Sequence, residues 1–204
     1  MFITFEGPNG VGKTTVLDGV LSELLATGLD TIKTKEPTKS SLGEFFKNAE
    51  ESHRGDCLAC LAAADRYFHV EQEIVPALSA GKIVLSDRYV ESSLVLQRLD
   101  GCDLEFVWNL NSRIPIPDIS IILVAEVEIL AERLLARRKQ LSRFELGEER
   151  NKEALFYREA ATFIAERGFN VLLLNNGVVP ISETITCIVQ EIKKLYEKKK
   201  ERKS

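Results

Sequence analysis

Eight residues near the start of the chain have the types and spacing of a phosphate-binding loop. The run Gly7-Pro8-Asn9-Gly10-Val11-Gly12-Lys13-Thr14 fits G-x-x-x-x-G-K-[ST] at each fixed position. Glycines let the backbone turn until successive N–H groups point at one place, where a phosphate can bind. Lys13 can then reach the β- and γ-phosphates of a nucleoside triphosphate, while the Thr14 hydroxyl can bind Mg²⁺. The cofactor-binding residues that this loop predicts are Gly7, Asn9, Gly10, Val11, Gly12, Lys13, Thr14 and Thr15.

The segments that flank this loop are the ones that such a motif requires. Met1 to Phe5 is apolar, β-branched and aromatic, which is typical of a short buried strand. Thr15 to Ala26 repeats valine and leucine at helical spacing, so its positive N-terminal end would face the phosphate. A glycine-rich turn that fits by chance is the alternative. The agreement of strand, loop and helix argues against it.

Two charged groups follow other expected strands. The apolar run from Lys82 to Ser86 is typical of a central parallel strand, and Asp87-Arg88 stands at its carboxyl end. Asp87 can hold Mg²⁺ directly or through water, while Arg88 can bind a phosphate through its forked guanidinium. The alternative is a surface ion pair. Glu36 follows the strand expected from Thr31 to Thr34, and it can face the same site or be an ordinary loop carboxylate.

Basic residues gather around the end of the helix expected from Val127 to Arg138. They are Arg137, Arg138, Lys139 and Arg143. Their separation from the glycine loop suits a lid around 137–150 that closes over transferring phosphates, where an arginine would stabilise transition-state charge. A solvated basic helix end is the alternative. With the glycine loop, these clusters predict phosphoryl transfer between two bound nucleotides.

The composition indicates one compact domain and excludes several classes of protein. The chain has 204 residues, 45% of them hydrophobic, and a net charge of −4, so a general affinity for nucleic acid or anionic membranes is not expected. No apolar run reaches the ~18 residues of a membrane span, and a signal-peptide layout is not found, so we expect a cytoplasmic protein. Cys57 and Cys60 are expected to be small core-facing helix residues, with a zinc site as the alternative.

Strands alternate with helices along the whole chain. The expected strands are Met1–Phe5, Thr31–Thr34, Lys82–Ser86, Ile119–Ala125 and Val171–Leu174. The long helical segments include Asp56–Ala80, with Pro76 near a start or kink, and Ile181–Tyr196, followed by a frayed charged end at Lys198–Ser204. This order predicts an α/β fold with a parallel sheet covered by helices on both faces.

The ordered set of motifs resembles the thymidylate kinase family over nearly the whole chain. The segments that carry the resemblance are Phe5-Glu6-Gly7, Lys35-Glu36-Pro37, Leu42-Gly43-Glu44, Ala63-Ala64-Asp65-Arg66, Asp87-Arg88-Tyr89, Ser92-Ser93, Gln97, Pro117-Asp118, Glu132-Arg133 and Arg143-Phe144-Glu145. The resemblance implies a three-layer P-loop kinase fold of about five parallel strands, formed by residues 1–204 as one domain, with a small arginine-bearing lid. It also implies a homodimer.

The resemblance implies a reaction and a role for each matching residue. ATP with Mg²⁺ is the expected phosphoryl donor, and a deoxynucleoside 5′-monophosphate, dTMP by default, is the expected acceptor; no nucleic-acid polymer is implied. The expected catalytic residues are Lys13, Asp87, Arg88, Arg137 and Arg143. The expected metal residues are Thr14, Asp87 and Glu36. The acceptor is expected to contact Glu36, Ala62, Arg66, Arg88, Ser92, Leu96 and Gln97.

Departures from the family pattern gather on the acceptor side. Ala62 stands where the family usually has a phenylalanine that stacks on thymine, and Leu96 where a tyrosine is common. Asn9 stands at a loop position that is often acidic, and Arg98 at a position that is often glycine. Losing a stacked ring costs roughly 1–3 kcal/mol, so a preference for another base is one alternative. A deoxynucleoside kinase and a nucleotide-binding regulatory protein that has lost its acceptor are the others.

Overall fold

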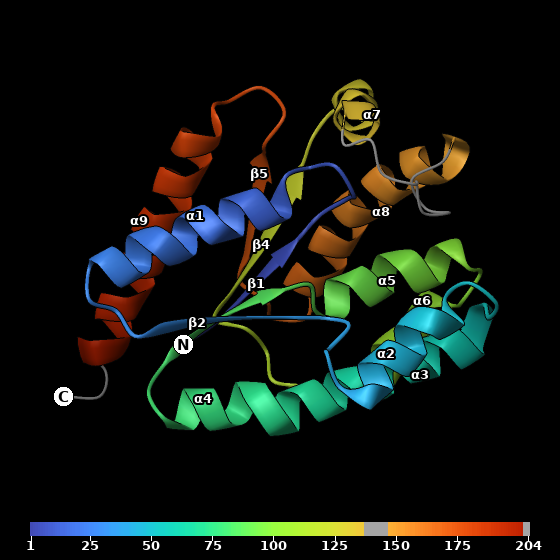
Figure 1. Cartoon of the computed structure of the whole chain (residues 1–204), viewed down its shortest axis with the longest axis horizontal. Helices are drawn as coiled ribbons and strands as arrows, with labels where there is room; N and C mark the ends of the chain where they lie inside the picture. Colours follow the sequence, from blue (N-terminus) through green and yellow to red (C-terminus); the bar gives the residue numbers. More distant parts are fainter. Residues whose placement is uncertain (137–146, 202–204) are drawn as a thin grey trace.

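The computed structural model describes residues 1–136 and 147–201. Within these ranges, a sheet of five parallel strands has the order β2-β3-β1-β4-β5 (Figure 1). The strands are β1 (Phe2–Glu6), β2 (Thr31–Lys35), β3 (Ile83–Asp87), β4 (Ile119–Val124) and β5 (Val171–Asn175). The expected α/β fold with a parallel sheet is therefore confirmed.

Helices connect the strands and cover both faces of the sheet (Figure 1). They are α1 (Lys13–Ala26), α2 (Ser41–Ala49), α3 (Gly55–His69), α4 (Val75–Ser79), α5 (Val90–Leu99), α6 (Leu104–Leu110), α7 (Val127–Ala136), α8 (Gly147–Ala165) and α9 (Ile181–Glu201). A π-helical turn, Val70–Ile74, joins α3 to α4.

Alternating strand residues feed two separate cores. Phe2, Val84 and Ile122 enter the core that α5 and α8 cover. Ile3, Leu85 and Ile121 enter the core that α1 and α9 cover, on the opposite face. The three central strands β1, β3 and β4 are therefore buried on both faces, which explains why their sequences are largely continuous apolar runs rather than alternating ones.

The register of the sheet brings the sequence motifs to one edge. Phe5 of β1 lies opposite Asp87 of β3, which in turn lies opposite Lys35 of β2. The glycine loop, Glu36 and Arg88 therefore begin side by side at the carboxyl edge of three neighbouring strands. Ligands bind at this edge in open parallel sheets.

The helical segment expected from Asp56 to Ala80, with Pro76 near a start or kink, is found as α3, the π turn and α4, and Pro76 lies in the first turn of α4. Two other sequence-based expectations on helices need correction. The charged end is not frayed from Lys198 onward, since α9 continues to Glu201. Cys57 and Cys60 are exposed rather than core-facing. The buried face of α3 is formed by other residues, among them Leu58, Ala59, Ala62 and Ala63.

Candidate functional site

The glycine loop has the backbone that its sequence predicts. Gly7 has a φ of 138°, and a Cβ there would lie 2.2 Å from the carbonyl oxygen of Leu123, so no side chain fits. Gly12, with a φ of 96°, precedes α1, which begins at Lys13. The Lys13 ammonium is curled into the loop and donates to the carbonyl oxygens of Gly7 at 2.6 Å and Pro8 at 3.3 Å.

Thr14 and Asp87 meet at the mouth of this loop. The Thr14 hydroxyl donates to Oδ2 of Asp87 at 3.2 Å, although 73 residues separate the two in sequence. Thr14 is exposed, and Asp87 is partly exposed. Hydroxyl and carboxylate oxygens are ligands that Mg²⁺ prefers, and this pair can take up the ion with waters completing its shell. The donor set therefore fits a magnesium ion.

Arg88 is held in a strained backbone conformation beside this pair. Among the described residues it is the one residue other than glycine with a positive φ, 77°. Its N–H donates to the carbonyl oxygen of Phe5 at 3.0 Å, and its carbonyl oxygen accepts from the Ser86 hydroxyl at 2.7 Å. Such strain persists where surrounding contacts hold it, and it is common at functional sites.

The Arg88 guanidinium points at the glycine loop. It donates to Oδ1 of Asn9 at 2.9 Å, to the Ser92 hydroxyl at 2.9 Å and to the Tyr157 hydroxyl at 3.2 Å. Burial lowers the pKa of Arg88, but the nearby Tyr157, Glu6 and other acidic groups outweigh it and raise that pKa above its ordinary value. Arg88 is therefore a fixed cation at the edge where the loop begins.

Lys13 and Arg88 form a concentrated positive site. Burial and the nearby Arg88 lower the pKa of Lys13 to about 8, against the opposing effect of Asp87, Glu153 and Glu6. Two cations in this position repel each other until an anion arrives. The arrangement can therefore bind a polyphosphate and neutralise it, which is the main demand of phosphoryl transfer.

Beneath the loop lies a buried pair of carboxyl groups that the sequence analysis did not single out. Glu6 accepts from the N–H groups of Tyr89 at 2.5 Å and Ser92 at 3.2 Å, so it caps the start of α5. Burial and the neighbouring Glu91 raise the pKa of Glu6 to about 8. Glu91 accepts from the hydroxyls of Thr4 and Ser120, and burial raises its pKa as well.

Two residues of α8 complete the donor side, and both were missed from the sequence. Glu153 is 0% exposed, and its two carboxylate oxygens each lie 3.3 Å from the backbone nitrogen of Asn9. Tyr157, one helical turn later, contacts Arg88 and Ser92. Glu153 and Tyr157 are four residues apart, so they share one face of α8 with the buried Ala161 and Ile164. This helical spacing is the sequence signal that could have identified the two residues.

The acceptor side centres on a buried ion pair. Arg66 of α3 pairs with Glu36 at 2.8 Å and also donates to Asn111 at 2.7 Å and to the Ser93 hydroxyl at 2.9 Å. The other oxygen of Glu36 lies 3.2 Å from Nδ1 of His69. The structure thus brings Glu36 and Arg66 together, and both side chains already have hydrogen-bond partners within the protein.

The three remaining acceptor-side candidates sit around this pair on α3 and α5. Ala62 is buried and packs in a small cluster with Phe46, Ala49 and Leu58. Leu96 of α5 is partly buried and packs against the core on that face of the sheet. Gln97 is 1% exposed, and its Oε1 has no hydrogen-bond partner among the described residues. A buried amide oxygen of this kind is a candidate for contact with a bound ligand.

Two of the predicted catalytic residues cannot be compared with the structure. Arg137 and Arg143 fall outside the described residues, as does most of the lid predicted around 137–150. Within residues 1–136 and 147–201, no cluster of three or more His, Cys, Asp or Glu side chains could hold a metal ion. Of the helices described, none is long and apolar enough to cross a membrane.

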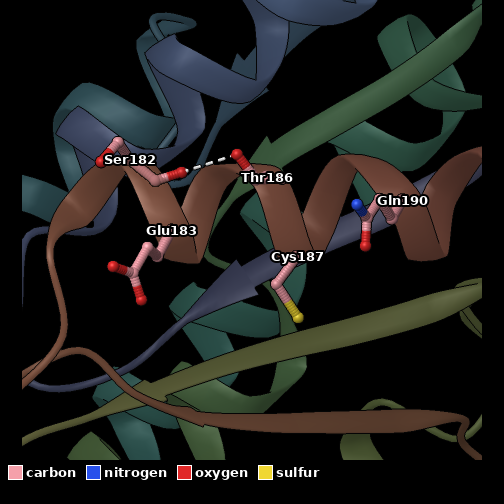
Figure 2. Close-up of a pocket in the computed structure, with 5 residues that line it drawn as sticks. All are labelled: Ser182, Glu183, Thr186, Cys187 and Gln190. Atoms are coloured by element: carbon pink, nitrogen blue, oxygen red, sulfur yellow. Dashed lines mark hydrogen bonds between the residues drawn. The ribbon is translucent and has the colours of Figure 1, made fainter.

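A separate hollow lies along α9 (Figure 2). The Thr186 hydroxyl within it donates to the carbonyl oxygen of Ser182 at 2.9 Å. The one charged residue in the lining is an anion, which would repel phosphate. The residues that line the hollow are Ser182, Glu183, Thr186, Cys187 and Gln190. None of the glycine-loop residues belongs to it.

Comparisons with known proteins agree with this geometry. The family model described as "Thymidylate kinase" matches residues 5–192. A "Probable thymidylate kinase" of Caldivirga maquilingensis is 33% identical, covering 98% of this chain and 94% of its own. A "Thymidylate kinase" of Desulfotalea psychrophila is 33% identical, covering 95% and 94%. A "Probable thymidylate kinase" of Pyrococcus horikoshii is 40% identical over 67% of this chain and 70% of its own. The chain belongs to the thymidylate kinase family.

Proposed function

We propose that this protein transfers the γ-phosphoryl group of ATP to dTMP, giving ADP and dTDP. The observation that carries the proposal is the meeting of Lys13, Thr14, Asp87 and Arg88 at one edge of the sheet. Family membership supports ATP as donor and makes the protein a nucleoside monophosphate kinase. The comparisons do not favour a deoxynucleoside kinase, a different base or a regulatory protein without activity.

On the donor side, Lys13 exchanges two internal partners for substrate. Its ammonium leaves the carbonyl oxygens of Gly7 and Pro8 and binds the β- and γ-phosphates. Thr14 and Asp87 would hold the magnesium ion, and Glu36 would act with them through water. When bound, Mg²⁺ neutralises charge on the β- and γ-phosphates and helps to orient them. The backbone N–H groups of the loop bind the remaining phosphate oxygens.

On the acceptor side, Arg88 orients the phosphate that receives the phosphoryl group. Ser92, which already donates its hydroxyl to Glu6 at 2.7 Å, supports that arginine from beneath. Arg66, Ala62, Leu96 and Gln97 would contact the nucleoside. Holding both anions in line removes most of the entropic cost of the reaction.

Three further parts of the proposal rest on the family likeness. Arg137 and Arg143, in a lid around 137–150 of this single domain, would stabilise charge that develops during transfer and exclude water. A homodimer is proposed because the family resemblance implies it. A cytoplasmic location is proposed on the same ground.

A panel of monophosphates tests the acceptor. The purified protein, with ATP and Mg²⁺, is assayed against dTMP, dUMP, dCMP, dGMP and dAMP by separating the diphosphate products. We expect dTMP to have the highest kcat/KM. If a monophosphate with another base has the highest kcat/KM, dTMP is not the preferred acceptor. In that case Ala62→Phe, which adds a ring, should shift turnover toward dTMP.

A further inference from the structure

Glu153 contacts the glycine loop from a helix that carries no part of the loop motif. It belongs to α8 and is 0% exposed, and its oxygens each lie 3.3 Å from the backbone nitrogen of Asn9. We propose that Glu153 is a positioning residue, which fixes Asn9 and through it aims Arg88 at the acceptor phosphate. This role rests on the phosphoryl transfer proposed above.

The first step is the contact between α8 and the loop. The Asn9 N–H is shared between the two carboxylate oxygens at 3.3 Å each, so this hydrogen bond is bifurcated and has an acidic group as its acceptor. It joins residues 144 apart in sequence, so it is formed only when α8 is packed in place. Because Glu153 is buried, water cannot readily replace it as the acceptor for this N–H.

The second step leads from Asn9 to Arg88. Once its backbone is fixed, the Asn9 side chain presents Oδ1 to the Arg88 guanidinium at 2.9 Å. Tyr157 of the same helix also contacts Arg88, since its hydroxyl accepts from the guanidinium at 3.2 Å. This hydroxyl lies beside Ser92, so it holds the guanidinium on the same side as Ser92 does. The asparagine therefore supplies the contact on the loop side of the guanidinium. Helix α8 thus holds Arg88 in two ways. Tyr157 contacts it directly, and Glu153 acts on it through Asn9 of the glycine loop.

The third step concerns charge. Glu153 lies close enough to act electrostatically on both Lys13 and Arg88. Before substrates bind, its carboxylate offsets part of the repulsion between these two cations. Asn9 is neutral, so the loop has no carboxylate of its own at that position. Glu153 supplies from α8 an acidic group that this loop lacks.

The direct test compares two substitutions of nearly the same size. Glu153→Met fills the space without accepting a hydrogen bond, whereas Glu153→Gln keeps an oxygen that can accept from the Asn9 N–H. We expect Glu153→Met to lower kcat/KM for dTMP about tenfold or more, the effect of losing a charged hydrogen bond. The KM for ATP should stay within about twofold, since Arg88 serves the acceptor, and Glu153→Gln should recover most of the loss.

A matched control and a double substitution separate positioning from general damage. Glu159→Met changes an exposed glutamate of the same helix, whose partner is Arg98, and should leave turnover nearly unchanged. Asn9→Ala cuts the same route one step later, so adding it to Glu153→Met should cause little further loss. Additive losses, a Glu153→Gln variant no better than Glu153→Met, or equal changes toward ATP and dTMP would each overturn the role.

A structural readout keeps this test independent of the proposed reaction. If the unaltered protein transfers no phosphoryl group to dTMP, the proposed function fails, but crystals of the unliganded variants still report on Arg88. We expect the contact between Arg88 and Oδ1 of Asn9 to be lost in Glu153→Met and kept in Glu153→Gln. An unmoved Arg88 in Glu153→Met contradicts the inference. If Glu153→Met does not fold, Glu153→Leu, which also cannot accept from the Asn9 N–H, takes its place in the comparison with Glu153→Gln.

Discussion

The donor and acceptor sides of this site are held together in different ways. On the donor side, Lys13 donates, among the described residues, to main-chain oxygens of its own loop, and the exposed Thr14 hydroxyl meets Asp87. On the acceptor side, Arg66 and Glu36 are buried and bonded to each other and to side chains from other elements. The donor groups can exchange partners at little cost. The acceptor groups cannot move without breaking a buried ion pair.

This difference separates activity from stability. Charged groups with replaceable partners can bind a ligand without loss to the fold, so substituting them should affect catalysis most. Removing one partner of a buried ion pair leaves the other charge buried without compensation. Substituting either partner should therefore lower the free energy of unfolding more than it affects catalysis. The buried pair of Arg66 and Glu36 is therefore part of the structural framework as well as of the proposed acceptor site.

The largest effect is expected from Lys13→Ala. Removing the ammonium takes away the cation that binds the β- and γ-phosphates, so kcat should fall by about a thousandfold or more. Its present partners are two main-chain carbonyl oxygens rather than a buried carboxylate, so the thermal midpoint should change less than for Arg66→Ala. Steady-state rates and circular dichroism measure the two quantities. A large loss of stability would contradict the view that donor groups are replaceable.

The next effect is expected from Arg66→Ala. The substitution leaves the carboxylate of Glu36 buried without its cation, so the free energy of unfolding should fall by about 3–5 kcal/mol in urea titrations. Lys33→Ala, which removes an exposed ion pair with Asp18, serves as the control and should cost about 1 kcal/mol or less. Equal losses in the two variants would remove the distinction between the two sides.

The buried carboxyl pair beneath the donor loop predicts a pH dependence of stability. The Glu6 pKa is 4.5 in the unfolded chain and about 8 in the folded protein, so the folded protein binds more protons between these values. The free energy of unfolding should therefore fall as pH rises through that window, by an amount on the order of a few kcal/mol. Thermal unfolding at pH 5, 6.5 and 8 measures it.

Glu6→Gln provides the control for that pH dependence. The amide resembles the protonated carboxyl in size and still accepts from the N–H groups of Tyr89 and Ser92. Its stability should therefore change much less between pH 5 and 8. If the free energy of unfolding of Glu6→Gln depends on pH as steeply as that of the unaltered protein, the group that titrates is not Glu6.

The smallest effect is expected from Arg98→Ala. Its guanidinium lies 3.9 Å from the centre of the Phe156 ring and 2.9 Å from Glu159, linking α5 to α8. Because Glu159 is exposed and Arg98 is only partly buried, removal of this contact should cost about 1 kcal/mol or less in urea titrations. A loss as large as that of Arg66→Ala would show that this surface contact carries the packing of α8.

The sequence was most informative where structure is local. The glycine loop, its strand and its helix follow from neighbouring residues, and the register of a parallel sheet then places Asp87 and Arg88 beside them. The partners of Arg66 come from three separate segments, so no single stretch could predict them. Glu153 stands among other glutamates of α8, and its burial depends on packing against a loop 144 residues away.

The stoichiometry of products tests the proposed reaction most directly. The purified protein is incubated with ATP, Mg²⁺ and dTMP, and the ADP and dTDP that form are quantified together over time. We expect one dTDP for each ADP, with little ADP formed when dTMP is omitted. ADP without dTDP, or ATP binding with no product from any monophosphate, would contradict phosphoryl transfer to dTMP.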